Sequence, residues 1–353
     1  MRRIPLVIGL VVMAAVLVSL PTGYWLLRGR QSAGGPQGEL IFTRQVEINK
    51  VSSENGIEPI AVIPSDLYVV SVDGSKRRLL ARNAAEAAVS PDGRSIAFTR
   101  DRAVWTMWRD GSGAKRIVRN ASTPAWSPDG RTIYFSRWVG SDLGTSIFSI
   151  RDDGTHLLRL TRAKGQPAED QWRGQGCFQY HEHPSPSPDG RALVYTDEPN
   201  ACSWGTDIRA VSRDGRPLRV PFRLLAGGTD PTWNHAPAWS PDGRQLAYVG
   251  GTSAGNPAGL YISRADGSAT GWIVDGRDPA WSPDGKWIAF DSSSPPGRYP
   301  PNGGIELIWR NGTHRQTVTQ PALCADLSAE NASLPRSRCV SFYDPAWLPS
   351  AAA

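Results

Sequence analysis

Short runs of alternating and β-branched residues recur along the chain after one repeated turn sequence. Ser-Pro-Asp-Gly begins at five positions: Ser90, Ser127, Ser187, Ser240 and Ser282. Proline presets the backbone at the second position and glycine accepts a left-handed conformation, so each copy predicts a tight hairpin turn. A strand-length run rich in branched and aromatic residues follows each turn, at 95–99, 132–136, 192–196, 245–249 and 287–291. The pattern predicts pairs of antiparallel strands.

A second hairpin signal completes each repeat. Asp-Gly or Asn-Gly follows the strand pair at 73–74, 110–111, 153–154, 214–215, 266–267 and 311–312. These dipeptides are typical of two-residue hairpin turns. Each unit therefore contains four antiparallel strands joined by two tight turns and one variable loop. Four strands in about 40–50 residues are typical of a β-propeller blade.

The two ends of the repeat region are complementary halves. Residues 39–44 match the strand at 95–100, and residues 344–347 match the strand start at 278–281. The C-terminus should therefore supply the inner strand of the blade that residue 39 begins, which removes the free sheet edges. The expected fold is all-β: a six-bladed propeller of four-stranded antiparallel blades over 39–349, with ring closure by the C-terminal strand.

The repeat resembles the Pro-Asp variant of the WD-type repeat in propellers of the TolB family. Pro-Ala-Trp-Ser-Pro-Asp-Gly stands at 124–130, 237–243 and 279–285, and the resemblance covers 39–349. It implies a periplasmic binding propeller. Members of that family carry an α/β domain before the propeller, and this chain has no such stretch before residue 39. Similar repeats occur in the propellers of dipeptidyl and prolyl peptidases, where they gate a hydrolase domain.

The N-terminus carries the longest apolar run. Residues 4–27 contain no charged side chain and would span about 36 Å as a helix, enough to cross a bilayer. We expect one transmembrane helix in a signal anchor at 1–30, a linker at 31–38 and a tail at 350–353. The propeller would lie outside the cytoplasm of a bacterial-type cell, attached through residues 4–27. A cleaved, secreted form is the alternative.

The four cysteines fit an oxidising compartment. They fall as two local pairs, Cys177 with Cys202 and Cys324 with Cys339, and we expect two disulfides. Free thiols are one alternative. Another is a zinc site formed by Cys177, His181, His183 and Cys202, although the spacing is not that of a standard zinc finger.

Composition excludes two classes of protein. Glycine (36) and proline (29) are too frequent for a helical bundle. The net charge is +6, but four arginines flank the apolar run, and 35 basic against 33 acidic residues remain without them. A nearly neutral body has no electrostatic footprint for nucleic acid, so no nucleic-acid partner is expected.

The long insertions should all fall on one face of the propeller. They are expected as loops at 45–65, 138–145, 162–182, 197–206, 226–235, 291–304 and 320–343. Elaborated loops opposite tight turns mark a candidate binding surface. Trp172, Trp204 and Trp233 fall in these loops and are candidate contacts for a partner. Tryptophans at 126, 239, 281 and 347 share one repeat position and should pack between blades instead.

The channel mouth is the second candidate site. The residue before each Pro-Ala-Trp or its equivalent starts an inner strand: Glu86, Thr123, His183, Ala236, Asp278 and Asp344. We expect Glu86, His183, Asp278 and Asp344 to converge on a funnel, with His235 nearby. Carboxylates and imidazoles could hold a cation such as calcium or a cationic part of a ligand. Alternatively, each side chain caps its own turn or faces water.

These features favour a non-enzymatic, membrane-anchored module that binds a protein or an envelope polymer through its loop-rich face. No cofactor is required by this interpretation. One alternative is an enzyme, a glycan lyase or hydrolase, in which the funnel carboxylates and His183 do acid–base work. Another is a sensor for a small ligand or cation.

Overall fold

The computed structural model describes residues 36–52, 56–140, 144–163, 179–198, 205–219, 234–251, 259–265, 269–292, 303–320, 325–326 and 336–349. Contacts divide the chain into two units, Met1–Gln37 and Gly38–Ala353. All regular elements among the described residues are β-strands. Within these residues no helix has the length and apolar character needed to cross a membrane, and the expected span at 4–27 lies outside them.

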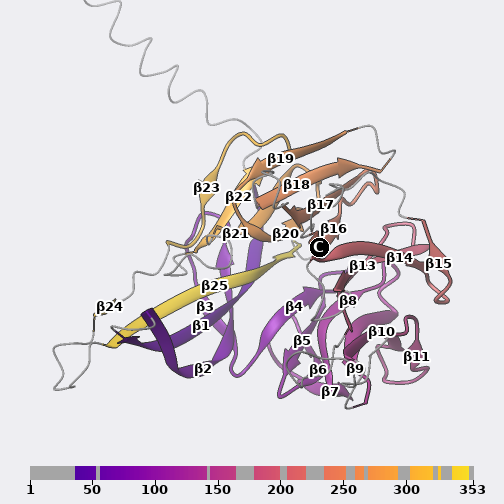
Figure 1. Ribbon diagram of the computed structural model, residues 1–353, viewed down its shortest axis with the longest axis horizontal. Coiled ribbons are helices and arrows are strands. Elements are labelled where there is room, and N and C mark those ends of the chain that lie inside the picture. The colour runs from indigo at the N-terminus through magenta and orange to yellow at the C-terminus, as the bar shows by residue number, and fades with distance from the viewer. Residues whose placement is uncertain are drawn as a thin grey trace, which may run out of the picture. The chain divides into compact units, whose positions relative to one another are not determined.

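Gly38–Ala353 is a β-propeller whose strands pair in antiparallel fashion except at one junction between β10 and β12 (Figure 1). Three sheets have four strands each: β4 (Ala85–Val89), β5 (Ser95–Arg100), β6 (Ala103–Trp108) and β7 (Lys115–Arg119); β16 (His235–Trp239), β17 (Gln245–Gly250), β18 (Gly259–Arg264) and β19 (Thr270–Val274); β20 (Arg277–Trp281), β21 (Trp287–Asp291), β22 (Ile305–Trp309) and β23 (Gln316–Thr317).

A five-stranded sheet joins the two ends of the propeller. Its order is β24 (Ala325–Asp326), β25 (Arg336–Leu348), β1 (Glu39–Ser52), β2 (Gly56–Ser71) and β3 (Arg78–Ala81). Ala346 on β25 lies opposite Ile41 on β1 in an antiparallel pair. The predicted pairing of the C-terminal strand with the strand at residue 39 is therefore confirmed, and Figure 1 shows β25 alongside β1.

The expectation of six separate four-stranded blades is wrong. The described strands form five sheets, because two groups of four strands are joined into one eight-stranded sheet. The sheet contains β8 (Ala121–Trp126), β9 (Thr132–Trp138), β10 (Gly144–Arg151), β11 (Leu158–Arg159), β12 (Gln179–Pro186), β13 (Ala192–Glu198), β14 (Asp207–Ser212) and β15 (Pro217–Leu218).

A glycine makes this junction possible. β10 and β12 pair in parallel through Gly144 opposite Gln179 and Thr145 opposite Tyr180. Gly144 has a φ of +77°, and a Cβ at this position would stand 1.9 Å from the Gln179 carbonyl oxygen. Only glycine lets the two backbones approach this closely.

Large parts of the expected loops at 45–65 and 320–343 are strand. β1 and β2 continue as a paired hairpin through most of 45–65, where a loop was expected. β25 begins at Arg336 and pairs with β1 as far as Lys50, so the end of the expected loop at 320–343 is also strand. The extra strand pairing satisfies backbone groups that a loop would expose to water.

The Ser-Pro-Asp-Gly turns form as predicted, with one added feature. In all five turns the serine hydroxyl donates to the aspartate Oδ1 at 2.6 Å, and the N–H after glycine donates to the same oxygen at 3.0–3.1 Å. The five glycines have φ between +66° and +70°. Each turn is thus stabilised by side-chain hydrogen bonds as well as by the backbone preferences of its proline and glycine.

Apolar clusters lie between neighbouring sheets and form the core. The second strand of each repeat contributes one buried aromatic side chain: Phe42, Phe98, Phe135, Tyr195, Tyr248 and Phe290. The repeated tryptophans pack between sheets as predicted. The indole N–H groups of Trp126, Trp281 and Trp347 donate to backbone carbonyls of the preceding innermost strand, those of Ala88, Ala238 and Ala280. These contacts fix the spacing of the innermost strands.

Candidate functional site

The innermost strands β4, β8, β12, β16, β20 and β25 contact one another in a closed cycle. Each contains the same irregularity, a residue with left-handed backbone next to a shift in strand register. These residues have φ between +47° and +53°: Glu86, Thr123, His183, Ala236, Asp278 and Asp344. A proline follows five of them, and Ala87 follows Glu86.

This irregularity is a β-bulge that turns one side chain per strand toward the propeller axis. Proline is accepted in a bulge because it need not donate a ladder hydrogen bond. A left-handed conformation costs a non-glycine residue about 1–2 kcal/mol, and it is most costly for a β-branched residue such as Thr123. Strain of this kind, repeated around the ring, is typical of functional sites.

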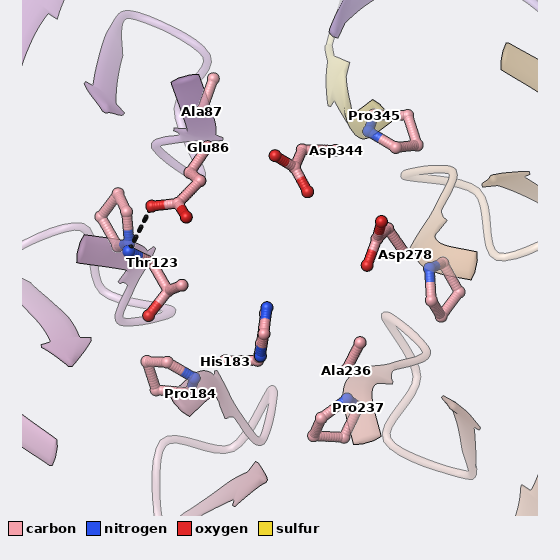
Figure 2. Close-up of a pocket in the computed structure, with 12 residues that line it drawn as sticks. Glu86, Ala87, Thr123, His183, Pro184, Ala236, Pro237, Asp278, Asp344 and Pro345 are labelled. Carbon is pink, nitrogen blue, oxygen red and sulfur yellow. Dashed lines mark hydrogen bonds between the residues drawn. The ribbon is translucent and has the colours of Figure 1, made fainter. Parts of the chain in front are cut away.

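The six residues line one cavity of about 190 Å³, together with the residue that follows each of them. Figure 2 shows their side chains arranged around a central space, with Glu86, Asp278, Asp344 and His183 facing one another across it. Four of the five predicted funnel residues are thus brought together. The fifth, His235, is half-buried beside the cavity and does not line it.

Glu86 is held firmly. Its Oε2 accepts hydrogen bonds from the Thr99 hydroxyl at 2.7 Å and from the Thr123 N–H at 2.8 Å. Its own N–H donates to the Thr43 hydroxyl at 3.2 Å. Glu86 therefore links the sheet β4–β7 to β8 while the carboxylate stays at the cavity wall.

Asp344 is the most perturbed acid of the cavity. Burial raises its pKa well above 3.8, and the negative charges of Asp278, Glu86 and Asp291 raise it further. The Thr43 hydroxyl, 3.5 Å from Oδ2, opposes this only weakly. Three carboxyl groups crowded around one space create a negative potential that a cation would relieve.

The two histidines differ in their surroundings. His183 has a buried Nδ1 that no described group contacts within hydrogen-bonding distance. For His235, burial lowers the pKa to about 4, and the nearby charge of Asp278 opposes this shift incompletely. His235 is therefore neutral near pH 7 and adds no positive charge to the funnel.

A row of buried polar side chains behind the bulges was not predicted. The Thr196 hydroxyl accepts from the Ala236 N–H at 3.1 Å, and the Ser136 hydroxyl lies 2.7 Å from that of Thr123. Together with Thr43 and Thr99, these hydroxyls support the bulge of the same or the next innermost strand. The signal is visible in the sequence of four repeats, where Thr or Ser follows the buried aromatic residue of the second strand; Val249 and Asp291 stand there in the other two.

A second polar cluster lies inside the eight-stranded sheet. His181 is buried in β12; its Nδ1 lies 2.7 Å from the Thr161 hydroxyl and its Nε2 lies 3.3 Å from Asp197 Oδ1. Asp197 also accepts from the Gln179 amide at 2.7 Å and pairs with Arg209. Residues 179–182, which were expected in a loop, belong to strand β12. The cluster connects β12, β13 and β14 to the chain after β11.

Other predicted sites lie outside the described residues. These are Trp172, Trp204 and Trp233, and Cys177, Cys202 and Cys324, whereas Cys339 lies on β25 with an undescribed side chain. The two disulfides and the zinc alternative therefore stay predictions. Among the described residues, no three His, Cys, Asp or Glu side chains are grouped so as to hold a metal ion.

Solved structures share this fold. TolB from Acinetobacter baumannii matches with a TM-score of 0.58 at 16% identity, over 89% of this chain and 67% of that one. A TolB candidate from Agrobacterium tumefaciens matches with a TM-score of 0.54 at 17% identity, over 86% and 99%. Hydrazine synthase from Kuenenia stuttgartiensis matches with a TM-score of 0.55 at 14% identity, over 89% and 47%.

Sequence comparisons give no closer relationship. No family model matches the chain. No curated protein matches it either. At 14–17% identity the structural likeness concerns the fold alone. The chain is thus a β-propeller of the kind found in TolB.

Proposed function

We propose that this chain is a non-enzymatic binding module that receives a primary amine of a protein partner in its funnel. The observation that carries the proposal is the meeting of Glu86, Asp278 and Asp344 around a cavity of about 190 Å³. The amine would be a lysine side chain or a chain N-terminus.

An ammonium group fits this wall better than a guanidinium. It is a compact charge with three donors that diverge, whereas the guanidinium is a flat fork suited to one carboxylate. The three carboxyl groups approach the cavity from three different strands, β4, β20 and β25. The negative charges of Asp278 and Glu86 contribute to the raised pKa of Asp344, and a bound ammonium would neutralise them.

The propeller fold supports a role in binding. The strained bulges are held by buried hydroxyls and by tryptophans between sheets, so the cavity is formed before any partner arrives. A preformed site loses little conformational entropy on binding. The likeness to the TolB fold supports a protein partner but does not identify that partner.

The surroundings of the funnel complete the proposal. Residues 1–30 would anchor the chain in a membrane, 31–38 would be a linker, and the propeller at 39–349 would lie outside the cytoplasm. Loops that carry Trp172, Trp204 and Trp233 would contact the partner around the funnel, held by disulfides Cys177–Cys202 and Cys324–Cys339. An envelope polymer is the alternative occupant of this outer surface.

A matched pair of variants tests the proposal. The detergent-extracted full chain would be used to capture partners after mild crosslinking, followed by an affinity measurement with the captured protein. We expect Asp278→Asn combined with Asp344→Asn to weaken binding at least tenfold, because both charges are removed at unchanged shape. Asp101→Asn, at an exposed position outside the cavity, should bind normally. Equal affinity of all three proteins would refute the funnel as the site.

An enzyme is the second candidate function. Its support is the raised pKa of Asp344 beside His183, since a carboxyl that keeps its proton can act as a general acid. The small cavity volume favours a side chain over a glycan as its occupant. Turnover of a glycan that is abolished by Asp344→Asn would favour the enzyme over the binding module.

A further inference from the structure

A groove of about 810 Å³ lies at the turn ends of β17, β18 and β19, beside the turn after β22. Three arginines from three separate segments line it. Arg244 follows a Ser-Pro-Asp-Gly turn, Arg264 ends β18, and Arg310 follows β22. None of them belongs to the funnel, whose residues lie at the bulges of the innermost strands.

The three guanidinium groups are available to a ligand. All three side chains are exposed, and among the described residues none has a carboxylate within ion-pair distance. One carboxylate, Asp242, also lines the groove. Its Oδ1 already accepts from the Ser240 hydroxyl at 2.6 Å and from the Arg244 N–H at 3.0 Å. The groove therefore carries an excess of two positive charges.

The floor of the groove is apolar and open. Ile262 is buried and Ile273 is half-buried, and both line the groove. Gly271 also lines it, and a Cβ added there would meet nothing within 4 Å. The missing side chain leaves room above β19 for the body of a ligand, and the volume lies in the range of small-molecule sites.

A second groove on the propeller is also lined by three arginines, but one of them already forms an ion pair. Arg78, Arg94 and Arg109 line a cavity of about 460 Å³ beside the exposed Trp108. There, Arg109 is already committed, because it pairs with Glu39 at 3.2 Å and also contacts the Pro349 carbonyl. Of these two grooves, the one with Arg244 has three arginines that form no ion pair with any described residue.

We propose that the groove lined by Arg244, Arg264 and Arg310 binds a phosphate monoester with an apolar body. A phosphate monoester carries between −1.5 and −2 charges near pH 7, which balances an excess of two positive charges, whereas a carboxylate carries only one. Guanidinium forks match phosphate oxygens in pairs. The apolar body of the ligand would lie on Ile262 and Ile273.

Phenyl phosphate is the probe for a direct test, by calorimetry on the full chain. We expect Arg244→Ala, Arg264→Ala and Arg310→Ala each to weaken binding about tenfold or more. Gly271→Leu should block the groove without changing any charge. Arg131→Ala, the same turn position in another repeat, should bind normally, as should the Asp278→Asn/Asp344→Asn funnel variant. Benzoate, with one charge, should bind much more weakly.

The outcomes separate a built site from diffuse charge. Normal binding by Gly271→Leu, or an equal loss in Arg131→Ala, would overturn the proposal. No binding of phenyl phosphate by the unaltered chain would overturn it too. Vesicles of phosphatidylcholine with phosphatidic acid form a second arm. Binding to the vesicles that needs Arg244 would identify a lipid as the source of the phosphate, and binding to phenyl phosphate alone would identify a free metabolite.

Discussion

The Glu86 carboxylate accepts the backbone N–H of Thr123 at 2.8 Å, across the boundary between two sheets of the propeller. Both residues have left-handed backbone, and both line the funnel. One side chain thus provides negative charge to the cavity and satisfies the N–H of the next bulge. The same hydrogen bond therefore shapes the cavity and connects two neighbouring sheets of the propeller.

Glu86→Ala should destabilise the propeller by about 1–3 kcal/mol, because the Thr123 N–H and the Thr99 hydroxyl both lose their acceptor. Urea unfolding measures the change. Glu86→Gln keeps an acceptor oxygen at the same place and should cost clearly less. If both variants unfold like the parent protein, the link between sheets has no energetic role.

Asp344 should make the propeller less stable as pH rises. Its pKa is raised in the folded state, so between its unfolded value near 3.8 and the folded value the folded chain binds more protons. Stability therefore falls with rising pH across this window. We expect Asp344→Asn to be more stable than the parent protein near pH 7 and to show a flatter dependence on pH. A loss of stability near pH 7 would contradict this account.

Such a gain would have a functional meaning. If Asp344 weakens the fold and is still required for binding, then its charge serves binding and not stability. Asp344→Asn should therefore combine higher stability with lower affinity for an amine-bearing partner, a combination that a purely structural residue would not give.

Asp197 should behave in the opposite way. Burial favours its protonated form, but the bonds from His181 and Gln179 and the charge of Arg209 outweigh this and lower its pKa. Its contribution is present above the unfolded pKa near 3.8 and is lost as pH falls through the folded pKa. Asp197→Ala should cost on the order of 3 kcal/mol at pH 7, measured by urea unfolding. Asp152→Ala, at an exposed turn, is the control and should change little.

Gly144→Ala should separate β10 from β12. The added Cβ would collide with the Gln179 carbonyl, and the backbone would be strained at its positive φ, at a combined cost of about 1–3 kcal/mol. Amide hydrogen exchange of Thr145 and Tyr180 should increase, while exchange in β16–β19 stays the same. Gly154→Ala, whose Cβ would meet nothing, is the control for the positive φ alone. Unchanged exchange in Gly144→Ala would show that the parallel pairing is not a stable contact.

Much of the fold could be predicted because each repeat carries its own local signals. The five Ser-Pro-Asp-Gly turns, the pairing of the C-terminal strand with the strand that begins at residue 39, and the packing of Trp126, Trp281 and Trp347 follow from short motifs. The fusion at Gly144 could not be predicted, since parallel pairing between residues 35 positions apart leaves no local pattern. The strand extension over 45–52 was missed because its partners at 336–343 are remote in the sequence.

The candidate site was predictable in position but not in construction. The residue before each Pro-Ala-Trp does line the cavity, because the repeat places it at the same point of every innermost strand. Its left-handed backbone was unexpected, since the residue before proline normally prefers extended backbone. His181 was expected in a surface loop, and only the fold brings Thr161 and Asp197 to it.

The central claim is that carboxylates of the funnel contact an amine of a protein partner. Zero-length carbodiimide crosslinking tests it most directly, because an amide forms only between a carboxylate and an amine that already touch. Mass spectrometry of the crosslinked full chain and its captured partner should locate the amide at Asp278, Asp344 or Glu86, joined to a lysine or an N-terminus of the partner. A partner that is crosslinked only at carboxylates outside the funnel would contradict the account.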